Sequence, residues 1–220
     1  MKIRHLFLAA MLFALCGCKM DGDPILFRSA LMGYLQEDGS FNGDDGRTYI
    51  FNNVSPNDNL KGISRLMVLL DAKEKLEDGI TYYADLLEYE IPLYKEPFTG
   101  MTPELVDSLG TDPLHIDNIW FSGKCLNMMN TFISLDGNSK HSVDLLVKEF
   151  PMQSDTLKLM LMHNAGTDKV ADTDDWSSGD SFSFYTSFPL ENVMPEKGGF
   201  VLDLEWRWGG EVKNITHVIK

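Results

Sequence analysis

Two carboxylates on one expected strand have the residue types and the spacing of a catalytic pair. Asp203 and Glu205 lie in the stretch 202–208, where apolar and polar residues alternate as in a strand. Their Cα atoms would be about 6.6 Å apart on one face, a range that includes the carboxylate pairs of glycoside hydrolases. Arg207 continues the row and is expected to pair with them, which favours a solvated polar face. A glycan-directed hydrolase with carboxylate catalysis is the alternative function.

A second group of candidate residues lies in an acidic segment that lacks strand or helix periodicity. The segment 164–180 contains Trp176 beside Asp174 and Asp175, and we expect a surface loop with these three as candidate binding residues. Clustered Asp side chains also suit Ca²⁺, but their spacing does not match an EF-hand loop. We therefore predict no metal site and no cofactor, with Ca²⁺ as the alternative.

The remaining reactive residue types do not form an enzyme motif. The chain has no Gly-x-Ser-x-Gly, Ser-x-x-Lys or His-Glu-x-x-His, the local arrangements that activate a serine or hold zinc. Cys125 is followed by Leu126, Met128 and Met129, which predicts a small buried core residue. His163 at the end of an expected strand is interpreted as a hydrogen-bonded structural histidine. These patterns favour a protein that is not an enzyme.

The N-terminus predicts secretion and a lipid anchor. Basic residues precede an apolar run over 6–15, which is the length of a secretory signal and too short to span a membrane. Leu15-Cys16-Gly17-Cys18 resembles the bacterial lipobox, so residues 1–17 are expected to be a signal peptide and Cys18 the acylated first residue. Residues 18–23 form a tether. Several acyl chains would hold the protein on a membrane, which predicts a cell-envelope location at the outer membrane, on its periplasmic or surface face.

The composition of the chain argues against a disordered protein and against a nucleic-acid-binding protein. Of the 220 residues, 44% are hydrophobic and 24% charged, which is typical of a folded protein and not of a disordered one. The 19 basic and 33 acidic residues give a net charge of −14, which opposes binding to nucleic acid. With Cys16 removed and Cys18 acylated, Cys125 has no disulfide partner in the chain, so the fold must depend on its apolar core.

Alternation with a period of two predicts a mainly β protein. In the first half, strands are expected at 25–36, 48–52, 63–72 and 80–91, separated by Gly- and Asp-rich turns, with one helical turn near 71–77. The Pro- and Gly-bearing stretch 92–101 then suggests a domain boundary. This division predicts one small β domain over 24–98.

The second half predicts one short helix and then a sandwich. Thr102 as N-cap, Pro103 in the first turn and Gly110 after the last turn delimit the helix. Gly209-Gly210 and the stretch 136–138 have the composition of hairpin turns. Seven further strands predict an antiparallel β-sandwich over 99–220; they are expected at 117–121, 124–135, 142–150, 156–163, 181–188, 200–208 and 212–219.

Two segments, together with the lipobox, resemble a known family. Residues 107–116 read Asp-Ser-Leu-Gly-Thr-Asp-Pro-Leu-His-Ile and lead into Asp-Asn-Ile-Trp at 117–120, and residues 161–165 read Leu-Met-His-Asn-Ala. The chain is thereby similar to the NigD-like lipoproteins of Bacteroidetes. The resemblance implies an OB-like barrel followed by a β-sandwich and a link to bacteriocin immunity. It brings no catalytic residues.

These observations together predict a membrane-anchored envelope lipoprotein that acts as a non-catalytic binding or accessory module. Its expected partners are the membrane, through the lipid on Cys18, and an envelope protein or glycan that contacts loops such as 164–180. Nucleic acid is not an expected partner.

The anchor gives a first testable prediction. Cys18→Ala removes the thiol that would carry the lipid, so we expect acylation to be lost and the chain to stay unprocessed or to enter the aqueous phase. Detergent phase partition and intact mass measure both effects. Unchanged membrane retention, or a mature N-terminus elsewhere without a fatty adduct, would contradict the prediction.

Overall fold

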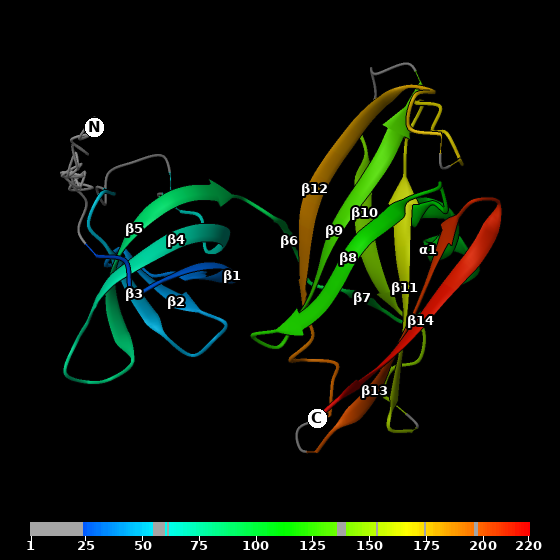
Figure 1. The fold of residues 1–220 in the computed structure, drawn as a ribbon. Coiled ribbons are helices and arrows are strands. Elements are labelled where there is room, and N and C mark those ends of the chain that lie inside the picture. Colours follow the sequence, from blue (N-terminus) through cyan, green and yellow to red (C-terminus); the bar gives the residue numbers. More distant parts are fainter. Residues whose placement is uncertain are drawn as a thin grey trace, which may run out of the picture.

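In a computed structural model, the chain forms two β lobes joined by an extended segment (Figure 1). The structure describes residues 24–54, 60, 62–135, 140–152, 154–173, 175–195 and 198–220. The predicted signal peptide, Cys18, the tether, Asp174 and the predicted turn at 136–138 lie outside the described residues. No helix in the described part of the chain has the length and apolar character needed to cross a bilayer.

The first lobe is a closed five-stranded barrel with the strand order β1-β2-β3-β5-β4, in which β4 returns to pair with β1. Its strands are β1 (Phe27–Leu35), β2 (Ser40–Gly43), β3 (Thr48–Phe51), β4 (Arg65–Lys75) and β5 (Thr81–Glu90). Strands β3 and β5 pair in parallel, and the other neighbours are antiparallel. The predicted OB-like barrel is thus confirmed.

Barrel closure explains two differences from the sequence prediction. Strand β4 extends to Lys75, into the helical turn expected at 71–77, because Ala72 is buried and pairs with Phe27 on β1. Strand β2 was not predicted, since Asn42 and Gly43 are residue types typical of turns, yet Phe41 between its ends is fully buried. In both segments, packing in the barrel interior overrides local propensity.

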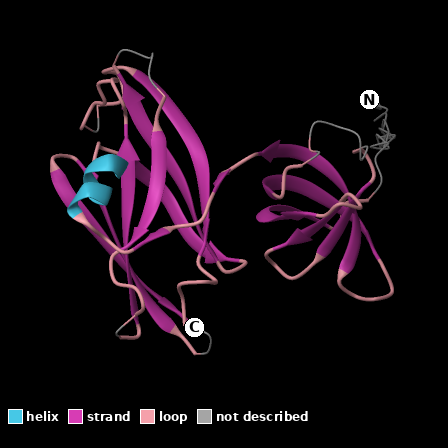
Figure 2. Cartoon of the chain, turned by 180° about the vertical axis from the view of Figure 1, so that it is seen from behind, coloured by secondary structure: helices cyan, strands magenta, loops and turns pink. Residues whose placement is uncertain are grey.

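The second lobe is a sandwich of two sheets, which Figure 2 shows as separate layers. One sheet has four strands in the order β6-β12-β9-β8 and the other has five in the order β14-β13-β11-β10-β7. The long strands are β8 (His115–Ser122), β9 (Cys125–Ser134), β10 (Ser142–Val147), β11 (Thr156–Asn164), β12 (Asp180–Pro189), β13 (Phe200–Trp208) and β14 (Glu211–Ile219). The predicted sandwich is confirmed.

The sandwich core consists of alternate residues from both sheets, as the sequence periodicity predicts. Leu126, Met128 and Phe188 from the four-stranded sheet and Leu145, Leu159 and Leu204 from the five-stranded sheet are all essentially inaccessible. The helix α1 (Pro103–Leu109) begins after Thr102, whose hydroxyl accepts the Leu105 N–H at 3.2 Å, and it ends at Gly110 as predicted. It packs against the outer side of β10 and β11 through Leu109, Leu146 and Met162.

The extended segment between the lobes belongs to both sandwich sheets. Its first part, β6 (Leu93–Tyr94), pairs in parallel with β12, and its second part, β7 (Phe98–Thr99), pairs in parallel with β10. Between them, the Lys95 ammonium forms an ion pair with Asp144 on β10. Short parallel strands of this kind have no sequence signature, and these two were not predicted. A further parallel pair joins β11 to β13, so the sandwich is not purely antiparallel.

Candidate functional site

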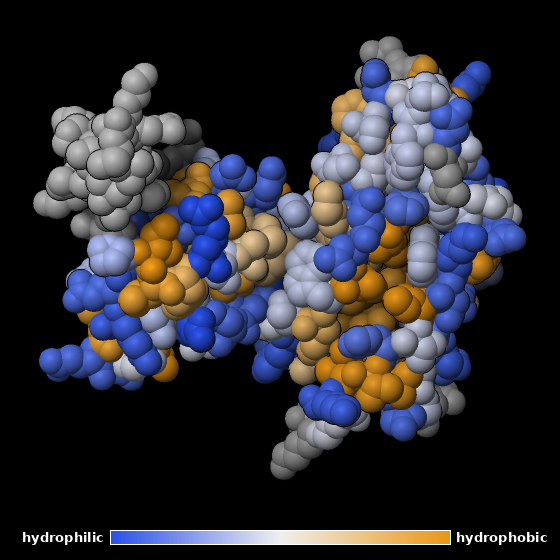
Figure 3. All heavy atoms as spheres, viewed as in Figure 1, coloured by the Kyte–Doolittle hydropathy of each residue, from blue (hydrophilic) through white to orange (hydrophobic). Residues whose placement is uncertain are grey.

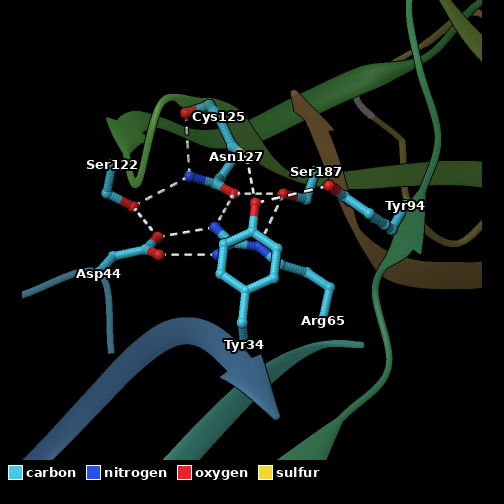
Figure 4. A network of polar contacts seen from close by, with 8 residues as sticks. All are labelled: Tyr34, Asp44, Arg65, Tyr94, Ser122, Cys125, Asn127 and Ser187. Carbon is cyan, nitrogen blue, oxygen red and sulfur yellow. Dashed lines mark hydrogen bonds and ion pairs between the residues drawn. The ribbon is translucent and has the colours of Figure 1, made fainter. Parts of the chain in front are cut away.

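A buried polar network joins the two lobes, and Figure 4 shows its side chains converging from both sides. Its centre is Arg65, the first residue of β4, which is 1% exposed. The guanidinium forms two parallel hydrogen bonds to the Asp44 carboxylate, each 2.7 Å long. This two-pronged geometry is the strongest arrangement available to an Arg–carboxylate pair.

Side chains of the sandwich occupy the remaining positions around this ion pair. The Arg65 guanidinium also donates to Ser187 Oγ and to Asn127 Oδ1, each at 3.2 Å. Ser122 Oγ donates to Asp44 at 2.5 Å and accepts from Asn127 Nδ2 at 3.1 Å. Burial is the largest single influence and lowers the pKa of Arg65. The hydrogen bonds to Asp44, together with the charge interactions with Cys125, Asp44 and Tyr34, outweigh it, and the pKa is raised. The guanidinium therefore stays charged although it is dry.

Backbone geometry at Gly123 allows the two lobes to come this close. Gly123, in the turn between β8 and β9, has a φ of +56°, and a Cβ atom there would lie 2.2 Å from the Asp44 carboxylate. Any other residue would push the carboxylate away.

Tyr34 closes the network on its other side. Its ring lies 4.4 Å below the Arg65 guanidinium, and its hydroxyl is 3.2 Å from Cys125 Sγ and 3.5 Å from the Tyr94 hydroxyl. Burial, followed by the hydrogen bond to Cys125, raises the pKa of Tyr34 far above its ordinary value of 10.0. Cys125 is fully buried, as predicted, but it lies at the domain interface. Since each polar group named here has a partner within the network, we assign it a structural role.

A second buried cluster lies in the sandwich and contains two neighbouring histidines. His163 on β11 is 1% exposed, and its Nδ1 donates to the Pro113 carbonyl at 2.9 Å. Its Nε2 lies 2.9 Å from His141 Nδ1, and His141 Nε2 lies 2.8 Å from Asp168 Oδ2. The ring of Phe132 stacks on His141 at 4.0 Å. The predicted structural role of His163 is confirmed, and its partners come from distant loops.

The contacts of this cluster favour a neutral His163. Its Nδ1 donates to the Pro113 carbonyl, and Nε2 of the neutral ring accepts from His141 Nδ1. Burial, the largest cause, accordingly lowers the pKa of His163.

The acidic residues of the predicted binding loop anchor that loop internally. Asp168 accepts a 2.6 Å hydrogen bond from Ser134 Oγ at the end of β9, in addition to its contact with His141. Asp172 accepts from the N–H groups of Gly209 and Gly210 at 2.5 and 2.7 Å. These two glycines have φ values of +66° and +72° and form the predicted hairpin turn between β13 and β14. The loop is therefore fixed to both sheets.

Trp176 is held in place by two further aromatic side chains. Its ring stacks on Trp208 at 5.8 Å with an interplanar angle of 19°, and the ring of His115 meets both indoles edge-on. Trp208 is buried, whereas Trp176 is 40% exposed. Asp175 accepts from the N–H and hydroxyl of Ser177, hydrogen bonds that lower its pKa. The group of Trp176, Trp208 and His115 is called the aromatic cluster below.

The candidate carboxylate pair has partners other than the expected one. Glu205 forms an ion pair with Lys148 at 2.8 Å, and Asp203 accepts from Asn214 Nδ2 at 2.6 Å. The predicted pairing with Arg207 is wrong, because neighbouring strands supply closer partners. Within the described ranges, no group of three His, Cys, Asp or Glu side chains is placed to hold a metal ion.

Two hollows lie in the part of the surface formed by described residues. One, of about 840 Å³, lies at the end of the barrel between the β1–β2 turn and the residues before β4. It is lined by apolar side chains such as Phe51 and Leu60, and Asp38 at its rim is bonded to Ser40. The other is a narrow apolar cleft between β8 and β14 that encloses about 30 Å³.

Comparison with known proteins identifies both the sandwich and the whole fold. The family model of the NigD-like C-terminal beta sandwich domain matches residues 97–215. A search of curated protein sequences finds no match.

Three solved structures from Bacteroides species are similar over both lobes. A protein of unknown function from Bacteroides vulgatus has a TM-score of 0.70 at 20% identity, covering 88% of this chain and 92% of its own. A NigD-like immunity protein from Bacteroides caccae has a TM-score of 0.56 at 18% identity, covering 87% and 92%. A protein provisionally described as a lipoprotein from Bacteroides fragilis has a TM-score of 0.59 at 11% identity, covering 88% and 98%.

The domain interface yields a stability prediction. Arg65→Met leaves the nearly buried Asp44 carboxylate without its cation, and we expect a loss of about 3–5 kcal/mol in the free energy of unfolding. Denaturant titration should also show separate transitions for the two lobes, where we expect a single transition for the wild type. Tyr34→Phe keeps the ring and is the matched control, with an expected loss of about 1 kcal/mol. A single transition with unchanged midpoint in Arg65→Met would contradict the assigned role.

The histidine cluster yields a pH prediction. The lowered pKa of His163 means that, below its ordinary value of 6.5, the unfolded chain binds a proton that the folded chain does not. Stability should therefore decrease as the pH falls, by up to about 1.4 kcal/mol per pH unit. His163→Gln should flatten the curve below about pH 6.5, whereas exposed His217→Gln should leave the slope as in the wild type. Equal slopes in all three proteins would refute the assignment.

Proposed function

Because this chain belongs to the NigD-like family, we propose that it is a non-catalytic accessory or immunity protein of the cell envelope. In this proposal the lipid on Cys18 anchors it to the outer membrane, and the aromatic cluster contacts a partner. The proposal draws on the immunity protein and the provisional lipoprotein among its structural neighbours. Those likenesses concern the fold, and the assignment to this chain is ours.

One observation carries the proposal, namely that an exposed indole is held rigid at the end of the sandwich. Trp176 is fixed by stacking on Trp208, and its loop is fixed by Asp168 and Asp172. A rigid, partly exposed aromatic side chain loses little conformational entropy on binding and is the typical anchor of a protein interface. The side chain is thus ready to bind without reorganisation.

The polar groups near this surface favour binding over catalysis. A general acid or base must reach a substrate, yet the His141–His163 pair is buried and bonded at each end. The carboxylates Asp203 and Glu205 are held by partners on neighbouring strands. These contacts support a module that recognises its partner through shape and apolar area.

Replacement of the exposed indole tests the proposal. In capture experiments from native envelopes, Trp176→Ala should reduce the recovered partner by about tenfold or more. Tyr89→Ala is the matched control, because Tyr89 is 41% exposed on the barrel, and it should bind like the wild type. Circular dichroism checks that both variants fold. Equal recovery with wild type and Trp176→Ala would remove the aromatic cluster from the proposed function.

A further inference from the structure

One flank of the sandwich is open. Strand β8 is the last strand of the four-stranded sheet and β14 the last strand of the five-stranded sheet. Among the described residues, β14 pairs only with β13 and β8 only with β9. Figure 3 shows hydrophobic surface between these two strands. This region, bounded by β8 and β14, is called the open flank.

Residues of the core reach the surface in the open flank. The cleft there is lined by Ile119 and Phe121 from β8 and by Ile215 and Ile219 from β14. It encloses about 30 Å³, whereas sites for small molecules have volumes of about 300–1,000 Å³. The open flank is thus too narrow for a compact ligand and suits single side chains.

The main chain of β14 presents hydrogen-bonding groups to this flank. On β13, the Arg207 carbonyl accepts from Leu114 and the Val201 N–H donates to Asp155, so both groups point away from β14. Their partners on β14, Val212 and Val218, are therefore non-hydrogen-bonded pairs whose own N–H and C=O groups point outward. Alternation adds Asn214 and Thr216 to this set. Four residues of β14 thus have unpaired ladder groups, an available edge for another strand.

The opposite flank shows how this sandwich accommodates an extended segment. There, residues 93–99 cross from one sheet to the other, pairing first with β12 and then with β10. The ion pair of Lys95 with Asp144 matches the charge of the segment to that of the sheet. One flank is therefore closed by an extended stretch of the chain itself, and the open flank offers the same kind of edges.

The charged side chains of β14 help to decide whether a second copy of this chain or a segment of another protein occupies the open flank. Lys213 and His217 pair with inward-facing Trp206 and Leu202, so they project to the inner side of β14. Antiparallel pairing of all nine residues with a second copy would centre on Ile215 and place Lys213 opposite His217 of that copy. In that pairing no carboxylate of the copy faces Lys213, whose ion pair with Glu211 lies within its own strand, so a dimer gains no charge complementarity there. A segment of another protein that places a carboxylate opposite Lys213 would be complementary in charge.

We propose that the open flank binds an extended segment of a partner protein, which adds a strand to β14. The segment has apolar side chains at alternate positions, facing Ile119 and Ile215, and a carboxylate facing Lys213 or His217. Main-chain hydrogen bonds would supply affinity and the cleft would supply specificity, as in other strand-addition complexes. This inference rests on the proposed binding function and names its partner class. The flank begins beside the aromatic cluster, since His115 starts β8 and Trp208 precedes β14.

A proline on β14 provides the test. Thr216→Pro removes an N–H that points to the open flank and leaves the hydrogen bonds to β13 intact, which edge strands tolerate. Thr216→Ala is the matched control for loss of the hydroxyl. The probe is a phage-displayed library of random dodecapeptides, selected on the full mature protein. Selected peptides are then labelled, and their affinities are measured by fluorescence anisotropy.

We expect peptides with alternating apolar residues and an acidic residue, bound at least tenfold more weakly by Thr216→Pro and equally by Thr216→Ala. Val218→Pro, at another outward-pointing position, should weaken binding in the same way if Thr216→Pro does not fold. Peptides without this pattern, or equal binding by both proline variants, would overturn the proposal. So would sedimentation velocity showing a wild-type dimer that Thr216→Pro abolishes, because the occupant would then be a second copy.

The proposed binding function of the aromatic cluster and the proposed strand addition to β14 can be disproved independently of each other. If Trp176→Ala loses the envelope partner while Thr216→Pro retains both that partner and the selected peptides, the binding function stands and strand addition fails. If Thr216→Pro loses the selected peptides while Trp176→Ala keeps the envelope partner, strand addition stands and the aromatic cluster is not the contact.

Discussion

The ion pair between Arg65 and Asp44 is the interaction on which the arrangement of the two lobes depends. Both charges belong to the barrel, yet the hydrogen bonds that complete them come from Asn127, Ser187 and Ser122 of the sandwich. A buried ion pair is stable only when its remaining donors and acceptors are also satisfied. Separation of the lobes would replace these sandwich partners by water and expose the ion pair to solvent, so each lobe is part of the other's electrostatic environment.

Polar side chains in the sandwich likewise hold parts of the chain in place through internal hydrogen bonds. Asp168 and Asp172 anchor the loop 164–180, and the histidine pair is enclosed between the Pro113 carbonyl and Asp168. An acidic loop of this kind reads in sequence as a ligand-binding segment, but most of its described carboxylates satisfy backbone or hydroxyl donors. What reaches the surface is an aromatic ring and two strand edges. These features suit recognition by shape, apolar area and main-chain pairing.

Local patterns in the sequence predicted most of the fold. Alternation located the long strands, and Thr102, Pro103 and Gly110 delimited the helix, because these signals act within a few residues. The missed elements, β2, β6 and β7, have two to four residues each and form through pairing with distant strands. Period-two alternation cannot be detected over such lengths.

The candidate sites were less predictable, because they are made of residues that are far apart in the chain. Trp176 could be singled out as an aromatic residue in a polar loop. Its stacking on Trp208 and its contact with His115 depend on how three elements meet. Arg65 falls within the strand expected at 63–72 and Cys125 was expected in the core. Both lie at the domain interface, 60 residues apart in sequence. No spacing rule links residues across two lobes.

The closed flank and the domain interface are stabilised by the same segment. Tyr94 in β6 pairs with the four-stranded sheet through its backbone, while its ring packs edge-on against Tyr34 of the barrel at 6.1 Å. Tyr34 in turn lies under the Arg65 guanidinium. Displacement of residues 93–99 by an incoming strand would therefore disturb the buried network as well as two strand pairings. Within the part of the chain that the structure describes, no comparable contact protects β14, which lies away from the barrel in Figure 1. An added strand consequently meets the least resistance on that side of the sandwich.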